Sequence, residues 1–204
     1  MTAPSVERLP SGRSSSKTLA RQDVVKHQRD RILHAMATTV ADTGYTHATV
    51  TRVITLAGVS RATFYQQFTN TRDCFLATFD LAVDLLVDAM VDETPGDLAG
   101  LIGLYLHRIV DQQTLARVLL LDIQSLGVEG VIRRSQSNER IRDRLADAVG
   151  ARTEADRFAC EAFVAAVGSL ITVQLAHRDA DAIMALHGPL TDIAERLFGQ
   201  SRLK

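Results

Sequence analysis

The chain has 204 residues, of which 46% are apolar and 23% charged, and its formal net charge is −1. This composition excludes an intrinsically disordered chain and is typical of a soluble globular protein with a substantial core. Two cysteines cannot build a disulfide framework, and the near-zero total charge does not indicate a nucleic-acid partner. With no secretory signal or membrane-spanning stretch visible, we expect a cytoplasmic protein that does not bind a membrane.

The chain is expected to begin with a flexible basic tail over residues 1–22, which contain two prolines, a serine run and four cations without a helical period. From residue 24 to 43 apolar residues recur at helical spacing, and Gly44 then favours a helix end. Thr49 and Ser60 are typical N-caps, so we predict two short helices at 49–57 and 60–67 with Gly58 between them.

Asn70, followed three residues later by Asp73, resembles a capping box for a helix that we expect to reach about residue 92. Such a helix would be roughly 34 Å long, enough to connect two bodies. Further helices are predicted at 97–112, 114–126, 128–149, 153–177 and 180–198, the last with a kink at Gly188-Pro189. Since no period-two alternation is present, the fold is predicted to be all-α with about nine helices.

The two short helices and the longer helix before them have the layout of a three-helix DNA-binding unit. Apolar residues such as Val53 and Phe64 can face inwards and leave polar side chains outwards. Arginine can pair with guanine, glutamine with adenine, and helix N-termini suit phosphates. An ordinary helical bundle with capped helices and polar faces would share many of these features.

The order and spacing of four motifs separate these two interpretations. They are Arg31-Ile32-Leu33-x-Ala35, Gly44-Tyr45, Ala48-Thr49-Val50 and AGVSRATFYQQF over residues 57–68. Together they resemble the N-terminal domain of the tetracycline-repressor (TetR) family of transcriptional regulators over about residues 29–79.

The resemblance implies a helix-turn-helix DNA-binding domain over 23–72 and an effector-binding and dimerisation domain over 73–204. It also implies a homodimer that binds a palindromic double-stranded DNA operator, acts as a repressor and is released by an unknown small-molecule effector. The residues that it assigns to DNA binding are Thr49, Thr51, Ser60, Arg61, Ala62, Thr63, Tyr65, Gln66, Gln67 and Thr71.

Three residues depart from the family pattern. Thr71, followed by Arg72, stands where many members have lysine, which leaves a phosphate contact there open. Ile54 replaces a usual alanine and predicts slightly splayed short helices. Val40 replaces a usual phenylalanine, which is a conservative change in the core.

The distribution of charge supports the DNA-binding interpretation independently. Residues 1–72 carry 10 basic and 4 acidic side chains, a net charge of +6, whereas residues 73–204 carry 13 and 20, a net charge of −7. A basic head on an acidic body is expected of a DNA-binding protein whose second domain stays away from the phosphates. The alternative is that solvent-exposed charged residues are distributed unevenly between the two parts by chance. The tail cations are expected either to contact the minor groove or the backbone of the DNA, or simply to be solvated.

The helix at 153–177 has no charge between residues 162 and 176, so it must be covered on all sides. Either it is an internal core helix, or it forms a four-helix interface with a second copy together with the last helix. The family resemblance favours the dimer. The predicted interface residues are Ala162, Ala166, Ser169, Leu170, Val173, Ile183, Leu186, Leu190, Ile193 and Leu197.

Candidates for the effector pocket lie on the helices between about residues 75 and 175. Each of them is also explained as an ordinary core or surface residue. They are Phe75, Phe79, Met90, Tyr105, His107, Gln124, Phe163 and Gln174.

No nucleophile elbow, Walker loop, dinucleotide fingerprint or H-E-x-x-H motif is present, so the sequence predicts no enzyme, catalytic residue, cofactor or metal site. Cys74 is expected in the first turn of a helix, where it is either a packed thiol or one with a lowered pKa and a redox role. The alternative to a regulator is a helical ligand-binding or adaptor protein of the same fold that has lost specific DNA binding, which Thr71 favours.

Overall fold

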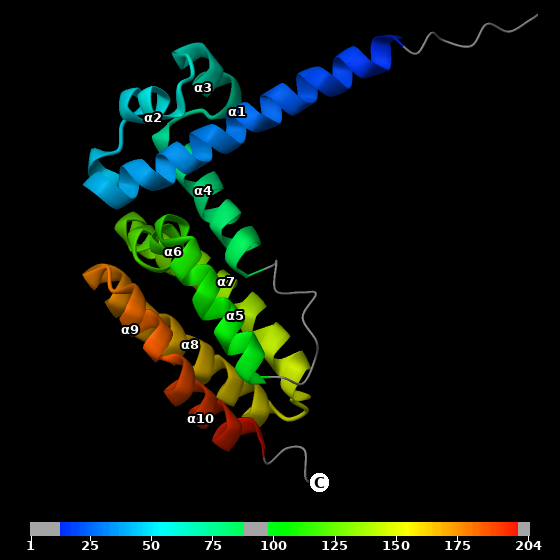
Figure 1. Ribbon diagram of the computed structural model, residues 1–204, viewed down its shortest axis with the longest axis vertical. Coiled ribbons are helices and arrows are strands. Elements are labelled where there is room, and N and C mark those ends of the chain that lie inside the picture. Colours follow the sequence, from blue (N-terminus) through cyan, green and yellow to red (C-terminus); the bar gives the residue numbers. More distant parts are fainter. Residues whose placement is uncertain (1–12, 88–97, 200–204) are drawn as a thin grey trace, which may run out of the picture.

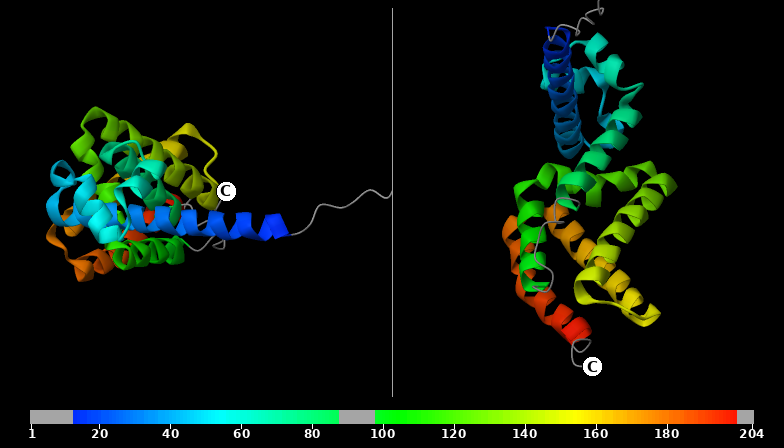
Figure 2. Two further views of the ribbon diagram at one scale, coloured as in Figure 1. Left: turned by 90° about the horizontal axis from the view of Figure 1, so that it is seen from above. Right: turned by 90° about the vertical axis from the view of Figure 1, so that its right-hand side faces the viewer.

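The computed structural model describes residues 13–87 and 98–199. Within these ranges the chain forms helices and no strand, which confirms the all-α class. Helices α1 to α3 form a head, α4 leads from the head towards a bundle formed by α5 to α10, and this bundle is the body (Figure 1; Figure 2, right).

In the head and its connection, η1, α2 and α3 are short, whereas α1 and α4 are longer. Their bounds are α1 Arg13–Thr43, the 3₁₀ helix η1 Tyr45–His47, α2 Val50–Ala57, α3 Arg61–Gln67 and α4 Thr71–Leu86. The body contains α5 Leu98–Asp111, α6 Gln113–Leu120, the 3₁₀ helix η3 Asp122–Leu126, α7 Val128–Val149, α8 Glu154–His177, α9 Ala180–Ala185 and α10 His187–Phe198.

Two predicted boundaries were wrong. Helix α1 begins at Arg13, so residues 13–22 continue a helix instead of forming a tail, because extending an existing helix adds one hydrogen bond per residue. Residues 1–12 lie outside the described ranges. Helix α4 ends at Leu86 instead of about residue 92, and its 16 residues span roughly 24 Å.

Two predicted helices are each divided. The segment 180–198 forms α9 and α10, which meet at Leu186. Pro189 has no N–H group to continue α9, but it fits the first turn of α10, where no intrahelical partner is needed. The segment 114–126 forms α6 and η3, so the described residues contain ten α-helices where about nine were expected.

The turn between α2 and α3 is held from α1. Gly58 ends α2 with φ 62° and ψ 42°, in the left-handed region that favours glycine. The Arg31 guanidinium donates to the carbonyl oxygens of Ala57 and Gly58, the latter at 2.8 Å. Because these carbonyls end a helix and lack intrahelical partners, the cation stabilises the helix end and the turn together.

Gly58→Ala is expected to lower the free energy of unfolding by roughly 2–3 kcal/mol. Besides the cost of a positive φ, its Cβ would lie 2.8 Å from Arg31 Nη2 and displace the guanidinium. Gly150→Ala is a matched control, since Gly150 ends α7 with φ 67° and ψ 37° and a Cβ there would meet no atom within 4 Å. Urea unfolding of both variants measures the difference, and equal losses would contradict the role of Arg31.

Head and body share one continuous hydrophobic core. Helix α4 packs against both α1 and α6, and α6 also packs against α1. Two polar contacts add to this junction: Arg72 in α4 forms an ion pair with Glu129 in α7, and Arg178 Nη2 donates to the Ala41 carbonyl oxygen of α1 at 3.2 Å. Arg178, which follows α8, is the one described non-glycine residue with a positive φ, at 58°.

Helix α8 is the one described helix that is long and apolar enough to cross a membrane. Core helices of soluble proteins share this composition, so the length alone is weak evidence. Seven α8 residues are buried, and the helix packs against α6, α7, α9 and α10. Helix α8 is therefore a core helix of which one face is exposed to solvent.

A buried ion pair joins α6 and η3 in the body. Arg117 Nη2 is 4.0 Å from Asp122 Oδ1, while Arg117 Nε and Asp122 Oδ2 have no hydrogen-bond partner among the described residues. Burial raises the pKa of Asp122 to about 6, although Arg117 lowers it. The folded protein consequently keeps the Asp122 proton at pH values where the unfolded chain has lost it.

The contribution of Asp122 to stability is therefore greatest below about pH 4 and falls as the pH rises through 6. Asp122→Asn removes this titration. We expect the free energy of unfolding of the variant, relative to the unmodified protein, to rise by roughly 2–3 kcal/mol between about pH 4 and pH 7. Urea unfolding at several pH values gives this difference. A constant difference would show that the pKa of Asp122 is not raised in the folded protein.

Candidate nucleic-acid interface and effector pocket

The three predicted N-caps of the head are confirmed. Thr49 Oγ1 accepts from the backbone N–H of Arg52 at 3.3 Å, Ser60 Oγ accepts from Thr63 at 3.0 Å, and Asn70 Oδ1 accepts from Asp73 at 2.9 Å. These caps fix where α2, α3 and α4 begin.

The polar surface of α2 and α3 is continuous. Arg61 Nη2 donates to Thr51 Oγ1 at 2.9 Å, which joins the two helices across their exposed faces. Tyr65 is 51% exposed, and its ring stands edge-on to the buried Phe64 at 5.5 Å. Most of the ten predicted DNA-binding residues are exposed: Thr49, Thr51, Ser60, Arg61, Ala62, Tyr65 and Gln66. The other three, Thr63, Gln67 and Thr71, are half-buried.

Arg29 supports this surface from α1, and the sequence analysis missed it. Its guanidinium lies 4.5 Å from the centre of the Phe68 ring and donates to the Gln67 carbonyl oxygen at 3.4 Å. It thus holds the end of α3 against α1 by a cation–π contact and a hydrogen bond. No local pattern connects residues this far apart in the chain.

The start of α4 differs from the phosphate site that a lysine would make. Thr71 is half-buried, and Arg72 is exposed but paired with Glu129 of the body. In this arrangement the Arg72 cation is directed to α7.

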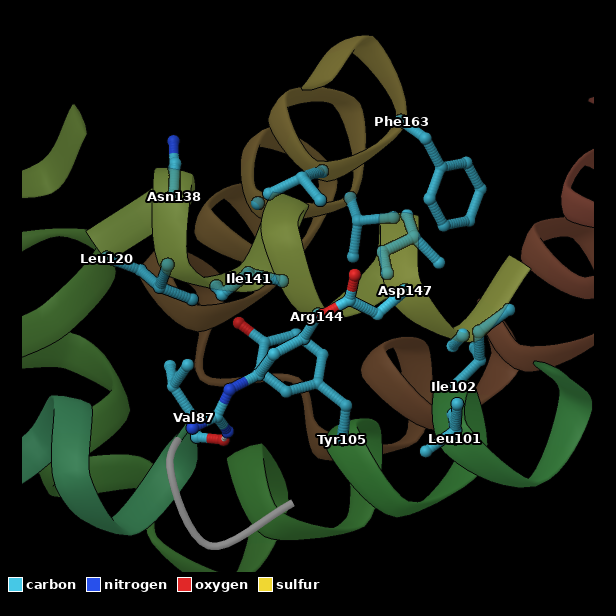
Figure 3. Close-up of a pocket in the computed structure, with 15 residues that line it drawn as sticks. Val87, Leu101, Ile102, Tyr105, Leu120, Asn138, Ile141, Arg144, Asp147 and Phe163 are labelled. Carbon is cyan, nitrogen blue, oxygen red and sulfur yellow. Dashed lines mark hydrogen bonds between the residues drawn. The ribbon is translucent and has the colours of Figure 1, made fainter. Parts of the chain in front are cut away.

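A pocket of about 370 Å³ lies between α5, α6, α7 and α8, next to the end of α4 (Figure 3). Most of its lining is apolar, and α7 supplies most of the polar side chains. It is lined by Val87, Leu101, Ile102, Tyr105, Leu120, Asn138, Ile141, Arg144, Leu145, Asp147, Ala148, Phe163, Val164, Val167 and Gly168.

The structure brings two of the predicted effector residues, Tyr105 and Phe163, into this pocket. Buried Phe75 and Phe79 belong to the core between head and body, because their side of α4 faces α1 and α6. The others do not line the pocket either: His107 and Gln124 are exposed, Gln174 is half-buried, and Met90 lies outside the described residues.

An apolar face of α8 and α10 is exposed on the body. It contains Phe158, Leu170 and Val173 on α8, which are 70%, 43% and 50% exposed, and Ile193 and Leu197 on α10. Ala162, Ala166 and Ser169 are exposed on the same face of α8.

Two residues assigned to the dimer interface were placed on the wrong side. Ile183 and Leu190 are 1% and 3% exposed and belong to the core of the body, and Leu186 is half-buried. Their spacing of three and four residues is that of any helix face, so the sequence did not distinguish the inner face from the outer one.

Residues 32–78 match the family model described as "Bacterial regulatory proteins, tetR family". The segment from α1 to the middle of α4 is therefore similar to this family. No curated protein sequence matches the chain.

Solved structures share the fold of the chain as a whole. The fatty acid degradation regulator FadR from Bacillus halodurans has 20% sequence identity and a TM-score of 0.65, with 84% of this chain and 95% of that one covered. A TetR-like transcriptional regulator from Rhodococcus sp. RHA1 has 17% identity and a TM-score of 0.61, with 80% and 92% covered. A TetR-family regulator from Streptomyces coelicolor has 19% identity and a TM-score of 0.58, with 84% and 98% covered. The chain therefore has the fold of these transcriptional regulators.

The surroundings of Cys74 in α4 do not favour a reactive thiol. The thiol is fully buried, and burial raises its pKa to about 12, although Arg29 lowers it. Of the two interpretations of this cysteine, the packed thiol agrees with the structure. Among the described residues, no cluster of His, Cys, Asp and Glu could hold a metal ion.

Proposed function

We propose that the protein is a cytoplasmic, homodimeric repressor that binds a palindromic operator and releases it when a small molecule occupies the pocket. The polar surface of α2 and α3 carries this proposal, because Arg61, Thr51 and Tyr65 lie exposed on the basic part of the chain. Side chains of these types read base edges in the major groove and contact phosphates.

The exposed apolar face of α8 and α10 supports a dimer. Large apolar side chains gathered on one face favour burial against another surface, and a second copy offers an identical face. A two-fold axis would place two α3 helices about one turn of DNA apart, which matches a palindrome.

The position of the pocket supports release by an effector. Its wall includes Val87, directly after α4, and Leu120, the last residue of α6. Since α4 and α6 both pack against α1, a ligand that shifts this wall also shifts the head. The change in DNA affinity then equals the difference in ligand affinity between the two arrangements.

A gel-shift titration with DNA that flanks the protein's own coding region tests the proposal. At physiological salt we expect binding to this DNA to be roughly 1,000-fold or more tighter than to random duplex. Equal affinity for both would contradict the repressor and support the alternative of a ligand-binding or adaptor protein that no longer recognises a DNA sequence.

A further inference from the structure

The pocket contains a hydrogen-bond donor, the Tyr105 hydroxyl, that has no partner among the described residues. Tyr105 is 9% exposed and lines the pocket, and none of the hydrogen bonds between described residues involves its hydroxyl. In Figure 3 this hydroxyl points towards Leu120 and away from Phe163 and Ile102. A hydroxyl without a partner in an apolar site is unfavourable, so an acceptor atom on a ligand would be stabilised there.

A cation lies directly behind the same part of the wall. Arg134 of α7 donates to the Leu120 carbonyl oxygen through Nη1 and to Thr172 Oγ1 through Nη2 at 3.4 Å. A Cβ at Gly168 would lie 3.2 Å from Nη2, so the glycine makes room for the guanidinium. Leu120 and Gly168 both line the pocket, which puts the charge of Arg134 next to the cavity.

Among the described residues, no carboxylate forms an ion pair with this cation, Arg134. Burial lowers the pKa of Arg134, while the neighbouring Tyr105 raises it. A partly buried cation without a counter-ion interacts strongly with an anion that enters the same low-dielectric region.

Two other charged side chains line the pocket, one basic and one acidic. Arg144 lines the pocket and donates to the Val87 carbonyl oxygen. Asp147 is the acidic residue in the lining, but it is exposed, so solvent screens its charge.

We propose that the pocket takes an apolar molecule with a single carboxylate, whose oxygen accepts from the Tyr105 hydroxyl beside Arg134 and whose apolar body packs against Ile102, Phe163 and Val164. This inference rests on the proposed effector site and names the chemical class of its ligand. A cavity of about 370 Å³ lies at the lower end of the range of roughly 300–1,000 Å³ for small-molecule sites, so the ligand is small.

Calorimetric titration of the DNA-free protein with chains of equal length tests the class of ligand. Decanoate, decanol and decylamine differ only in their head groups, and naphthoate with its neutral amide repeats the comparison on an aromatic body. We expect each carboxylate to bind at one site per chain and roughly 10-fold or more tighter than its neutral or cationic counterpart. Equal affinity for decanoate and decanol, preference for decylamine, or no binding of any probe would overturn the inference.

Three variants locate the carboxylate. Tyr105→Phe and Arg134→Gln are expected to lose most of the preference for decanoate over decanol, whereas Arg134→Lys keeps the charge and most of the preference. Arg157→Gln, on an exposed position of α8, is the control and should bind like the unmodified protein. If Arg134→Gln does not fold, Tyr105→Phe decides, and an unchanged preference in that variant would contradict the assigned carboxylate position.

Failure of this inference is distinguishable from failure of the proposed function. Binding of the probes is measured without DNA, and operator binding is measured without probes. Specific DNA binding together with equal affinity for decanoate and decanol would leave the repressor standing and remove the carboxylate ligand. Tight decanoate binding without specific DNA binding would support the carboxylate ligand and contradict the repressor.

Discussion

Arg61→Ala is expected to weaken operator binding roughly 10- to 100-fold and to relax sequence preference at one base pair of each half-site. Arg61 lies exposed at the start of α3 and is hydrogen-bonded to Thr51 on α2. Because the hydrogen bond already restricts the guanidinium on this surface, less freedom is lost when it meets a base edge. Gel shifts with the operator and with single-base variants measure both effects.

Two further variants separate the role of Arg61 from loss of local structure. Thr51→Val removes the hydrogen bond but keeps the arginine, so we expect a smaller loss of affinity. Arg157→Ala removes an exposed arginine from α8 and should leave operator binding nearly unchanged. If Arg61→Ala binds the operator with its original affinity and sequence preference, α3 does not read bases through this residue.

Leu170→Asp is expected to convert the proposed dimer to monomers and to weaken operator binding by more than about 100-fold. Leu170 is 43% exposed in the middle of the apolar face of α8, close to Val173. An aspartate there would be buried in the interface in two copies related by the two-fold axis, where like charges repel and are costly to desolvate. Monomers would contact one half-site at a time.

Sedimentation at micromolar concentration measures the oligomeric state, and circular dichroism checks that the helices remain. Val128→Asp is the matched control, because Val128 is 77% exposed at the start of α7, away from this face. It should stay dimeric with unchanged DNA affinity. A dimeric Leu170→Asp variant, or an unmodified protein that sediments as a monomer, would refute the interface.

The head was predictable because its signals are local. N-caps at Thr49, Ser60 and Asn70 act within three residues, and the glycine at position 58 ends α2 through its own backbone conformation. By contrast, the contacts of Arg29 with Phe68 and of Arg31 with Gly58 join distant segments, so no spacing in the sequence indicates them.

The pocket was only partly predictable for the same reason. Tyr105 and Phe163 were among the candidates, but the residues of α7 that line the cavity were missed. Helix α7 has polar residues at most positions, so its sequence indicates a solvated helix. Only the packing of α7 against α8 turns Asn138, Ile141 and Arg144 towards a cavity.

Arg178 combines two features at one position: a strained backbone and a side-chain contact between body and head. Its backbone has a positive φ, and its side chain reaches the Ala41 carbonyl oxygen of the head. Glycine at this position would relieve the backbone strain and lose the contact, whereas lysine would keep a cation and retain the strain. We therefore expect Arg178→Gly to stabilise the backbone while the head loses one contact with the body, so that stability and the connection between head and body can be changed separately.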